Sequence, residues 1–126
     1  MSCCCPHSRS AGRFFSLFAT RYRRRFARKG LEPSQRQLLA GLERTGFSGA
    51  EVLEIGCGVG HLHQTLLERG AGTAVGIDLA PRMLREAELW AKERGLAPQA
   101  RYLEGDFVTM DRDLATADVT LQARPR

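Results

Sequence analysis

The sequence predicts an α/β fold in which helices cover a small parallel sheet, and three observations point to it. Residues 51–55 form a short apolar run with β-branched side chains, which is typical of a buried parallel strand. Three glycines at alternate positions follow this run, and a helical segment follows the glycines. Two later apolar runs, at 73–77 and 100–104, each lead into an acidic residue. A strand, a glycine turn and a helix start in this order predict a nucleotide-binding βα unit.

The first predicted element is an amphipathic helix at residues 13–29, which Gly30 can close. Aromatic residues recur in it at every fourth position: Phe14, Phe18, Tyr22 and Phe26. We interpret the segment as a helix that lays this aromatic stripe on the domain or over the ligand cleft. Its arginines leave two alternatives open. One is an RNA-binding arm, and the other is a membrane-surface or organelle-targeting helix.

A second helix is predicted at residues 33–46. Pro33 suits its first turn and Gly46 suits its end. Its apolar face is formed by Leu38, Leu39 and Leu42, and we expect this face to cover the sheet.

The turns after the three strands decide the class of ligand. The dinucleotide pattern G-x-G-x-x-G needs a glycine at position 61, where this chain has His61. Glu54, two residues before the first glycine, repels a pyrophosphate and suits a cationic or amine-bearing ligand. Asp78 ends the second strand, where a carboxylate can hold a ribose diol. After the third strand, Asp106 can accept from an adenine amine while Phe107 covers the ring.

The helices that follow the glycine turn and the second strand are predicted at residues 61–69, closed by Gly70, and from Pro81 onward. His61 and His63 are two positions apart, so their side chains point in different directions, and we interpret both as structural or surface residues. The second of these helices has a buried stripe at Met83, Leu84, Ala87 and Ala91. We expect Met83 and Trp90 to belong to the core rather than to contact a ligand.

Charge is distributed unevenly along the 126 residues. The formal net charge is +5, yet residues 1–30 contain eight basic side chains and no acidic one. The folded part is therefore mildly acidic. Cys3, Cys4 and Cys5 are interpreted as part of a disordered tip, with a soft-metal site as the alternative. With no apolar run long enough for a membrane span or a secretory signal, a cytoplasmic location is expected, and no metal site is predicted.

The motifs at Glu54–Gly60, Asp78 and Gly105–Phe107 resemble those of class I S-adenosylmethionine-dependent methyltransferases, and the resemblance runs over roughly residues 30–120. It implies a Rossmann-like fold, here its N-terminal half only, with a partial parallel sheet of order 3-2-1-4 preceded by N-terminal helices. The cofactor-binding residues it implies are Glu54, Gly56, Cys57 and Gly58 around the methionine part, Asp78 and Leu79 at the ribose, and Asp106 and Phe107 at the adenine. Gln35 or Arg36 is a candidate for reaching the cofactor carboxylate. The leader and residues 31–36 resemble bacterial magnesium-protoporphyrin-methyltransferase-like members.

The predicted organisation comprises a disordered Cys-rich tip (1–12), basic and amphipathic helices (13–46), an S-adenosylmethionine-binding half-domain (47–121) and a tail (122–126). A fourth strand is predicted at 117–121, and we interpret the chain as truncated after it, with a complete small domain as the alternative. No catalytic base is assigned, because acceptor-side residues in the resembling enzymes lie at or beyond Leu121.

The predicted function is S-adenosylmethionine-dependent methyl transfer to an unidentified acceptor, most simply a small molecule. One alternative is a non-catalytic cofactor-binding fragment that needs a partner chain or further strands to complete its sheet. Less favoured alternatives are an RNA methyltransferase that uses the basic arm and an NAD-type dinucleotide binder.

Overall fold

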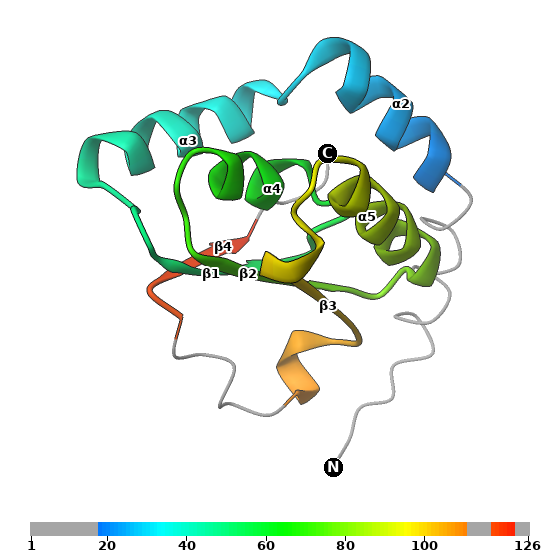
Figure 1. The fold of residues 1–126 in the computed structure, drawn as a ribbon. Coiled ribbons are helices and arrows are strands. Elements are labelled where there is room, and N and C mark those ends of the chain that lie inside the picture. Colours follow the sequence, from blue (N-terminus) through cyan, green and yellow to red (C-terminus); the bar gives the residue numbers. More distant parts are fainter. Residues whose placement is uncertain (1–17, 111–116, 123–126) are drawn as a thin grey trace.

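The computed structural model describes residues 18–110 and 117–122, and it confirms the α/β fold. Its parallel sheet contains β1 (Glu51–Ile55), β2 (Thr73–Asp78), β3 (Ala100–Glu104) and β4 (Val119–Gln122). The strand order is β3-β2-β1-β4, as the family resemblance implied. Figure 1 shows the sheet below a layer of four helices. The connections from β1 to β2 and from β2 to β3 run through that layer, as parallel strands require.

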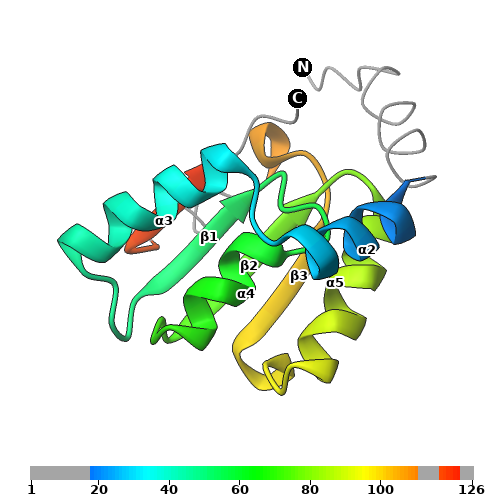
Figure 2. The same ribbon diagram turned by 90° about the horizontal axis from the view of Figure 1, so that it is seen from above.

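The helical layer consists of α2 (Ala19–Lys29), α3 (Pro33–Thr45), α4 (His61–Glu68) and α5 (Pro81–Glu93). Two short 3₁₀ turns, η1 (Ala97–Gln99) and η2 (Phe107–Thr109), precede and follow β3. Viewed from above, α4 and α5 lie over the strands that they connect, and α2 and α3 lie along one side of the layer (Figure 2). Pro33 and Pro81 stand in the first turn of their helices, as predicted.

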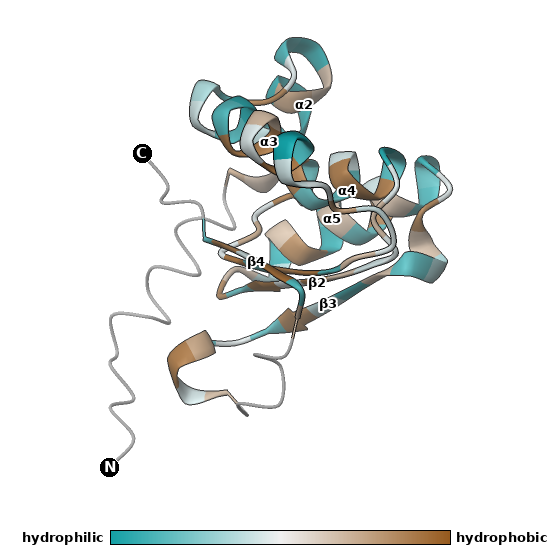
Figure 3. Cartoon of the chain, turned by 90° about the vertical axis from the view of Figure 1, so that its left-hand side faces the viewer, coloured by the Kyte–Doolittle hydropathy of each residue, from teal (hydrophilic) through white to brown (hydrophobic). Residues whose placement is uncertain are grey.

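The main core lies between these helices and the upper face of the sheet. Leu62 and Leu66 of α4 are fully buried against Val52 of β1 and Ala74 of β2. The predicted stripe of α5 is buried as well, at Met83, Leu84, Ala87 and Ala91. Figure 3 shows hydrophobic and hydrophilic colours mixed on the helices and on the strands, with a hydrophilic stretch on the edge strand β3.

Several element boundaries and one core residue differ from the predictions. Phe18 is the N-cap of α2 rather than part of the helix, β2 extends to Asp78, and β4 begins at Val119 rather than at residue 117. The helix α4 ends at Glu68, with Arg69 as its C-cap, and Gln122 belongs to β4 rather than to a tail. Leu38 is 39% exposed, whereas Leu39 is buried. Consecutive helical residues project about 100° apart, and on α3 the core covers the side of Leu39 and leaves Leu38 at its margin. The prediction that Leu38 belongs to the apolar face of α3 was therefore wrong.

The helix α2 lies on the domain, as the first interpretation of the basic leader predicts. Tyr22 and Phe26 pack against a small cluster that contains Val59 and Met83. Arg23 fastens the same helix to α5 through ion pairs with Glu86, at 3.2 Å, and with Glu93. Phe14 and the Cys-rich tip lie outside the described residues.

In the described part of the chain, no helix has both the length and the apolar character needed to cross a membrane. Residues 18–110 and 117–122 also contain no group of three or more His, Cys, Asp or Glu side chains that could hold a metal ion.

Candidate donor-binding site

A cavity of about 350 Å³ opens at the carboxyl edge of the sheet, where the ends of β1, β2 and β3 meet. Parallel strands leave such a crevice beyond their carboxyl ends, and ligands of open α/β sheets bind there. Seven of the eight residues that the sequence predicted as cofactor contacts line it: Gly56, Cys57, Gly58, Asp78, Leu79, Asp106 and Phe107. The structure therefore brings together three turns that are far apart in the sequence.

The glycine turn forms the inner wall of the cavity. Gly56, Gly58 and Gly60 all have positive φ values (69°, 56° and 82°), a conformation that side chains other than glycine rarely adopt. The amides of Gly56 and Cys57 both donate to the carbonyl of Ile77, at 2.8 and 3.0 Å. These bonds tie the turn to the end of β2.

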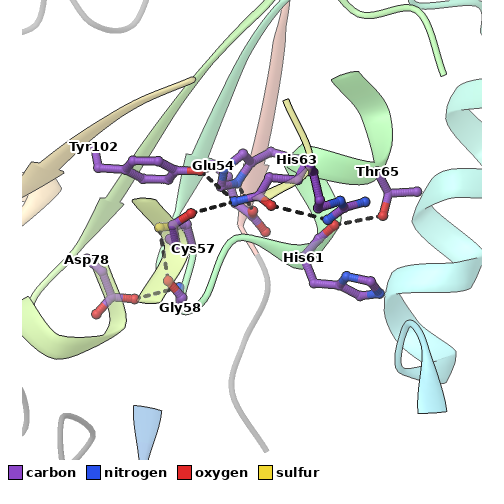
Figure 4. A network of polar contacts seen from close by, with 11 residues as sticks. Glu54, Cys57, Gly58, His61, His63, Thr65, Asp78 and Tyr102 are labelled. Atoms are coloured by element: carbon purple, nitrogen blue, oxygen red, sulfur yellow. Dashed lines mark hydrogen bonds and ion pairs between the residues drawn. The ribbon is translucent and has the colours of Figure 1, made fainter. Parts of the chain in front are cut away.

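Asp78 connects the glycine turn with the start of α5. Its Oδ2 accepts from the amide of Gly58 and its Oδ1 accepts from the amide of Ala80, both at 2.8 Å. Figure 4 shows the carboxylate beside Gly58. Each carboxylate oxygen has a second lone pair, so both can still accept from a ligand hydroxyl at the mouth of the cavity.

The turn after β3 supplies the opposite wall. Asp106 caps η2 by accepting from the amide of Val108 at 3.0 Å, which leaves its other oxygen free of any bond found among the described residues. Phe107 and Leu79 add apolar surface to the cavity. Met83 both lines the cavity and packs in the core, so the prediction that assigned it to the core alone was incomplete.

Glu54 lies behind the glycine turn and does not line the cavity. Its side chain is 1% exposed, and its Oε1 lies 2.7 Å from Nδ1 of His63. Residues along a strand alternate between its two faces, so Glu54 shares the helix-covered face of β1 with Val52. The expected direct contact between Glu54 and the ligand is therefore not what the structure shows.

The helices α2 and α3 close the cavity, which agrees with the interpretation of the aromatic stripe as a cover over the ligand cleft. Tyr22, Phe26 and Ser34 line it, together with Gln35, which was a candidate. Arg36, the other candidate, donates to the carbonyl of Leu31 and is not a lining residue. The four-residue aromatic spacing predicted a stripe on α2 but could not show which cavity the stripe would cover.

His61 also lines the cavity, between two aromatic rings. It stacks on Phe26, with ring centroids 5.2 Å apart, and on Trp90, at 4.8 Å. Burial, with a smaller effect of the Arg94 charge, lowers the pKa of His61 to about 4. The imidazole is therefore neutral at pH 7. It connects α2 and α5 across the start of α4.

The described residues that line the cavity carry three carboxylates, on Glu32, Asp78 and Asp106, and no lysine or arginine. Burial and the charge of Glu54 raise the pKa of the Cys57 thiol well above its ordinary value, so the thiol stays protonated. The cavity lining is thus acidic, and the Cys57 thiol within it is neutral. It suits a cationic ligand and does not suit a pyrophosphate.

The sequence and structure comparisons agree with this geometry. A family described as "Methyltransferase domain" matches residues 52–124. The chain belongs to this family, in the class I group of S-adenosylmethionine-dependent methyltransferases.

The curated relatives found include enzymes named "Ubiquinone biosynthesis O-methyltransferase". The one from Pseudomonas fluorescens is 38% identical over 64 residues, and one from Pseudomonas aeruginosa is 39% identical over the same length. Each match covers 51% of this chain and 27% of the relative. The matched region therefore spans about a quarter of the length of these relatives.

Solved structures place the fold in the same class. An S-adenosylmethionine-dependent methyltransferase from Thiobacillus denitrificans, in complex with S-adenosyl-L-homocysteine, is 29% identical with a TM-score of 0.51, and the match covers 60% of this chain and 30% of that one. Magnesium protoporphyrin IX methyltransferase from Synechocystis PCC 6803, with bound S-adenosylhomocysteine, is 25% identical with a TM-score of 0.61. That match covers 71% of this chain and 40% of that one.

Proposed function

We propose that this chain binds S-adenosylmethionine in the 350 Å³ cavity and serves in methyl transfer to a hydroxyl oxygen of a small molecule. The observation that carries the proposal is the charge of the cavity lining, which has three carboxylates, of which Glu32 is paired with Arg25 at 3.6 Å, and, among the described residues, no lysine or arginine. Such a lining favours a ligand with sulfonium and ammonium groups, and it disfavours the pyrophosphate of an NAD-type dinucleotide.

The residues present fit this cofactor. We assign the exposed backbone of Gly56, Cys57 and Gly58 to its methionine part, since glycine lets a ligand approach the main chain closely. The free lone pairs of Asp78 suit the ribose hydroxyls, with Leu79 beside them. Asp106 and Phe107 supply an acceptor and a ring face for the adenine.

When bound, the cofactor supplies a methyl group activated by its sulfonium. The protein then has to orient donor and acceptor in line and exclude water. The aromatic wall of Tyr22 and Phe26 suits the second task, because it covers the cavity on the side away from the sheet. Among the described lining residues, His61 has a pKa of about 4, which makes it a poor proton acceptor. We therefore assign no general base.

Transfer to oxygen is supported by the 38% identity to enzymes named as O-methyltransferases. We assign the acceptor to the side lined by α2 and α3, where Tyr22, Ser34 and Gln35 are neutral and the Glu32 carboxylate at the start of α3 is paired with Arg25. Neutral hydrogen-bonding and aromatic groups suit a small hydroxylated molecule better than a charged one.

The direct test is calorimetric titration of the full chain with S-adenosylhomocysteine and, in parallel, with NAD. Saturable binding of S-adenosylhomocysteine without binding of NAD is expected. Preferential NAD binding would contradict the proposal. Cofactor binding without methylation of any hydroxylated acceptor pool would favour the alternative, a cofactor-binding unit that needs a partner chain beside β3 or β4, the two edge strands of the described sheet.

A second candidate, an RNA acceptor, rests on the exposed side of α2. That side carries five basic residues without an acidic one in the helix: Arg21, Arg24, Arg25, Arg28 and Lys29. Such a surface contacts phosphates. Replacing Arg21, Arg24 and Arg28 with glutamine should abolish RNA retention on a filter if RNA is the acceptor. Unchanged retention would remove this candidate.

A further inference from the structure

Beneath the glycine turn, four polar side chains form a buried hydrogen-bonded chain: Glu54, His63, Tyr102 and Gln64. His63 and Gln64 are completely buried, and Glu54 is 1% exposed. The ring of His63 lies between Oε1 of Glu54 and the hydroxyl of Tyr102, each 2.7 Å from a ring nitrogen. Figure 4 shows Tyr102 pointing toward this group, and it comes from β3, with β2 between it and β1.

The orientation of the Gln64 side-chain amide determines which group donates in each hydrogen bond of this buried network. The Nε2 of Gln64 donates to the carbonyl of Ala87 at 2.9 Å and to the Tyr102 hydroxyl at 2.8 Å, and its Oε1 accepts from Arg94 at 3.2 Å. A carbonyl can only accept and a guanidinium can only donate, so the orientation of the Gln64 amide is fixed.

The proton positions on Tyr102 and His63 follow in turn. The Tyr102 oxygen accepts from Gln64, and its own hydrogen needs an acceptor in this part-buried place; Nε2 of His63 is the acceptor found for it among the described residues. Nε2 is therefore an acceptor, and Nδ1 carries the proton and donates to Glu54. His63 is neutral in this arrangement, and Glu54 keeps its negative charge.

The hydrogen-bonded side chains of His63, Gln64 and Tyr102 are in direct contact with the glycine turn and with β2 beside it. A Cβ built on Gly60 would lie 2.8 Å from Cε1 of His63 and 2.9 Å from Nε2 of Gln64, so these two side chains form the surface on which the turn rests. A Cβ on Gly76 would likewise meet Sγ of Cys57 at 2.8 Å and the ring of Tyr102 at 2.9 Å. The turn is thus supported from below by the polar chain and held from the side by β2.

We propose that His63 is a positioning residue for the donor site, which supports the glycine turn and keeps the Glu54 carboxylate ionised behind it. This inference rests on the proposed function. An anion at this place favours the positively charged donor over the demethylated product, which has lost the sulfonium charge. His63 therefore contributes to the discrimination between the two ligands without touching either. It was interpreted from the sequence as a structural or surface residue, and its burial agrees with the first of these.

The first experiment does not depend on any ligand. Nitrogen-15 NMR of the histidine-labelled chain should show His63 as the neutral Nδ1–H tautomer at pH 7. Observation of the Nε2–H tautomer or of an imidazolium would overturn the proton arrangement and the proposal with it.

The second experiment measures the ratio of the affinities for S-adenosylmethionine and S-adenosylhomocysteine by calorimetry. Glu54→Gln should lower this ratio by about five- to tenfold, because a charge near the ligand is lost. His63→Leu should lower it by a similar factor, because it removes the hydrogen-bond donor that favours the ionised form of Glu54. The double variant should equal Glu54→Gln alone, since both changes act through one charge. Leu66→Val, on the same helix but outside the polar chain, is the control and should leave the ratio unchanged.

A ratio that stays at the wild-type value in His63→Leu, while the melting temperature falls as in Leu66→Val, would show a merely structural role. Failure of the wild type to bind either ligand would instead refute the proposed function, and this inference would fall with it.

Discussion

Asp78→Asn is the most direct perturbation of the donor site, because this carboxylate holds two backbone amides at once. Its oxygens accept from Gly58 and Ala80, each at 2.8 Å. In asparagine one of the two oxygens becomes an NH₂ group, so one amide faces a donor instead of an acceptor. A hydrogen bond to a charged group contributes about 1.5–3 kcal/mol.

Loss of that amount at the turn corresponds to a weakening of S-adenosylhomocysteine binding by about ten- to a hundredfold, given about 1.4 kcal/mol for each factor of ten. Calorimetric titration of the wild type and the variant measures the effect, and circular dichroism with a melting curve shows whether the fold is retained. Asp118→Asn is the matched control. Asp118 accepts from the amide of Glu51 at 2.9 Å, at the opposite edge of the sheet, so this variant should bind normally. A folded Asp78→Asn chain with wild-type affinity would refute the reasoning.

Three further predictions concern stability and the wall of the cavity. Gly72→Ala places a Cβ 2.7 Å from the backbone oxygen of Gly49 and should destabilise the protein by about 1–3 kcal/mol. Gly41→Ala, with open space inside α3, should instead stabilise it by about 0.5–1 kcal/mol. Urea unfolding measures both free energies. The pKa of His61 is about 4 in the folded chain and about 6.5 in the unfolded chain. Between these pH values the unfolded chain binds more protons than the folded chain. The wild type should therefore lose stability as the pH falls from 6.5 toward 4. His61→Phe should lose less over this window, and an identical loss would contradict the assignment. Arg23→Glu should loosen α2 and weaken S-adenosylhomocysteine binding several-fold, because Arg23 pairs with Glu86 and Glu93 of α5, while Arg21→Glu, at an exposed position, should not.

The sequence pattern predicted the strands and the turns well, because the residue types in each turn are required by the backbone conformation of that turn itself. Glycines with positive φ, an acid at the end of β2 and a proline at the start of α5 act within a few residues of their own position. Their convergence on one cavity follows from parallel strand pairing, which aligns the carboxyl ends.

The sequence predicted Glu54 and His63 less well because their roles depend on what covers them. Strand alternation places Glu54 on the side of α4, where it meets His63, yet the second partner of His63 is Tyr102 on β3, 39 residues further along the chain. The spacing of Tyr22 and Phe26 predicted a covering stripe, but the residues that lie opposite that stripe depend on tertiary packing. Nothing in the sequence pattern singled out Ser34.

The place of β4 beside β1 has a consequence for how the chain folds. Val52 pairs with Val119, so the central strand finds its second neighbour only after most of the sequence has been made. Until then β1 has one unpaired side with free backbone groups, which is the kind of edge that recruits other chains. Closing so long a loop is also slow. We therefore expect the yield of soluble protein during synthesis to depend on how quickly β4 docks, and hence on chaperones that shield the nascent sheet.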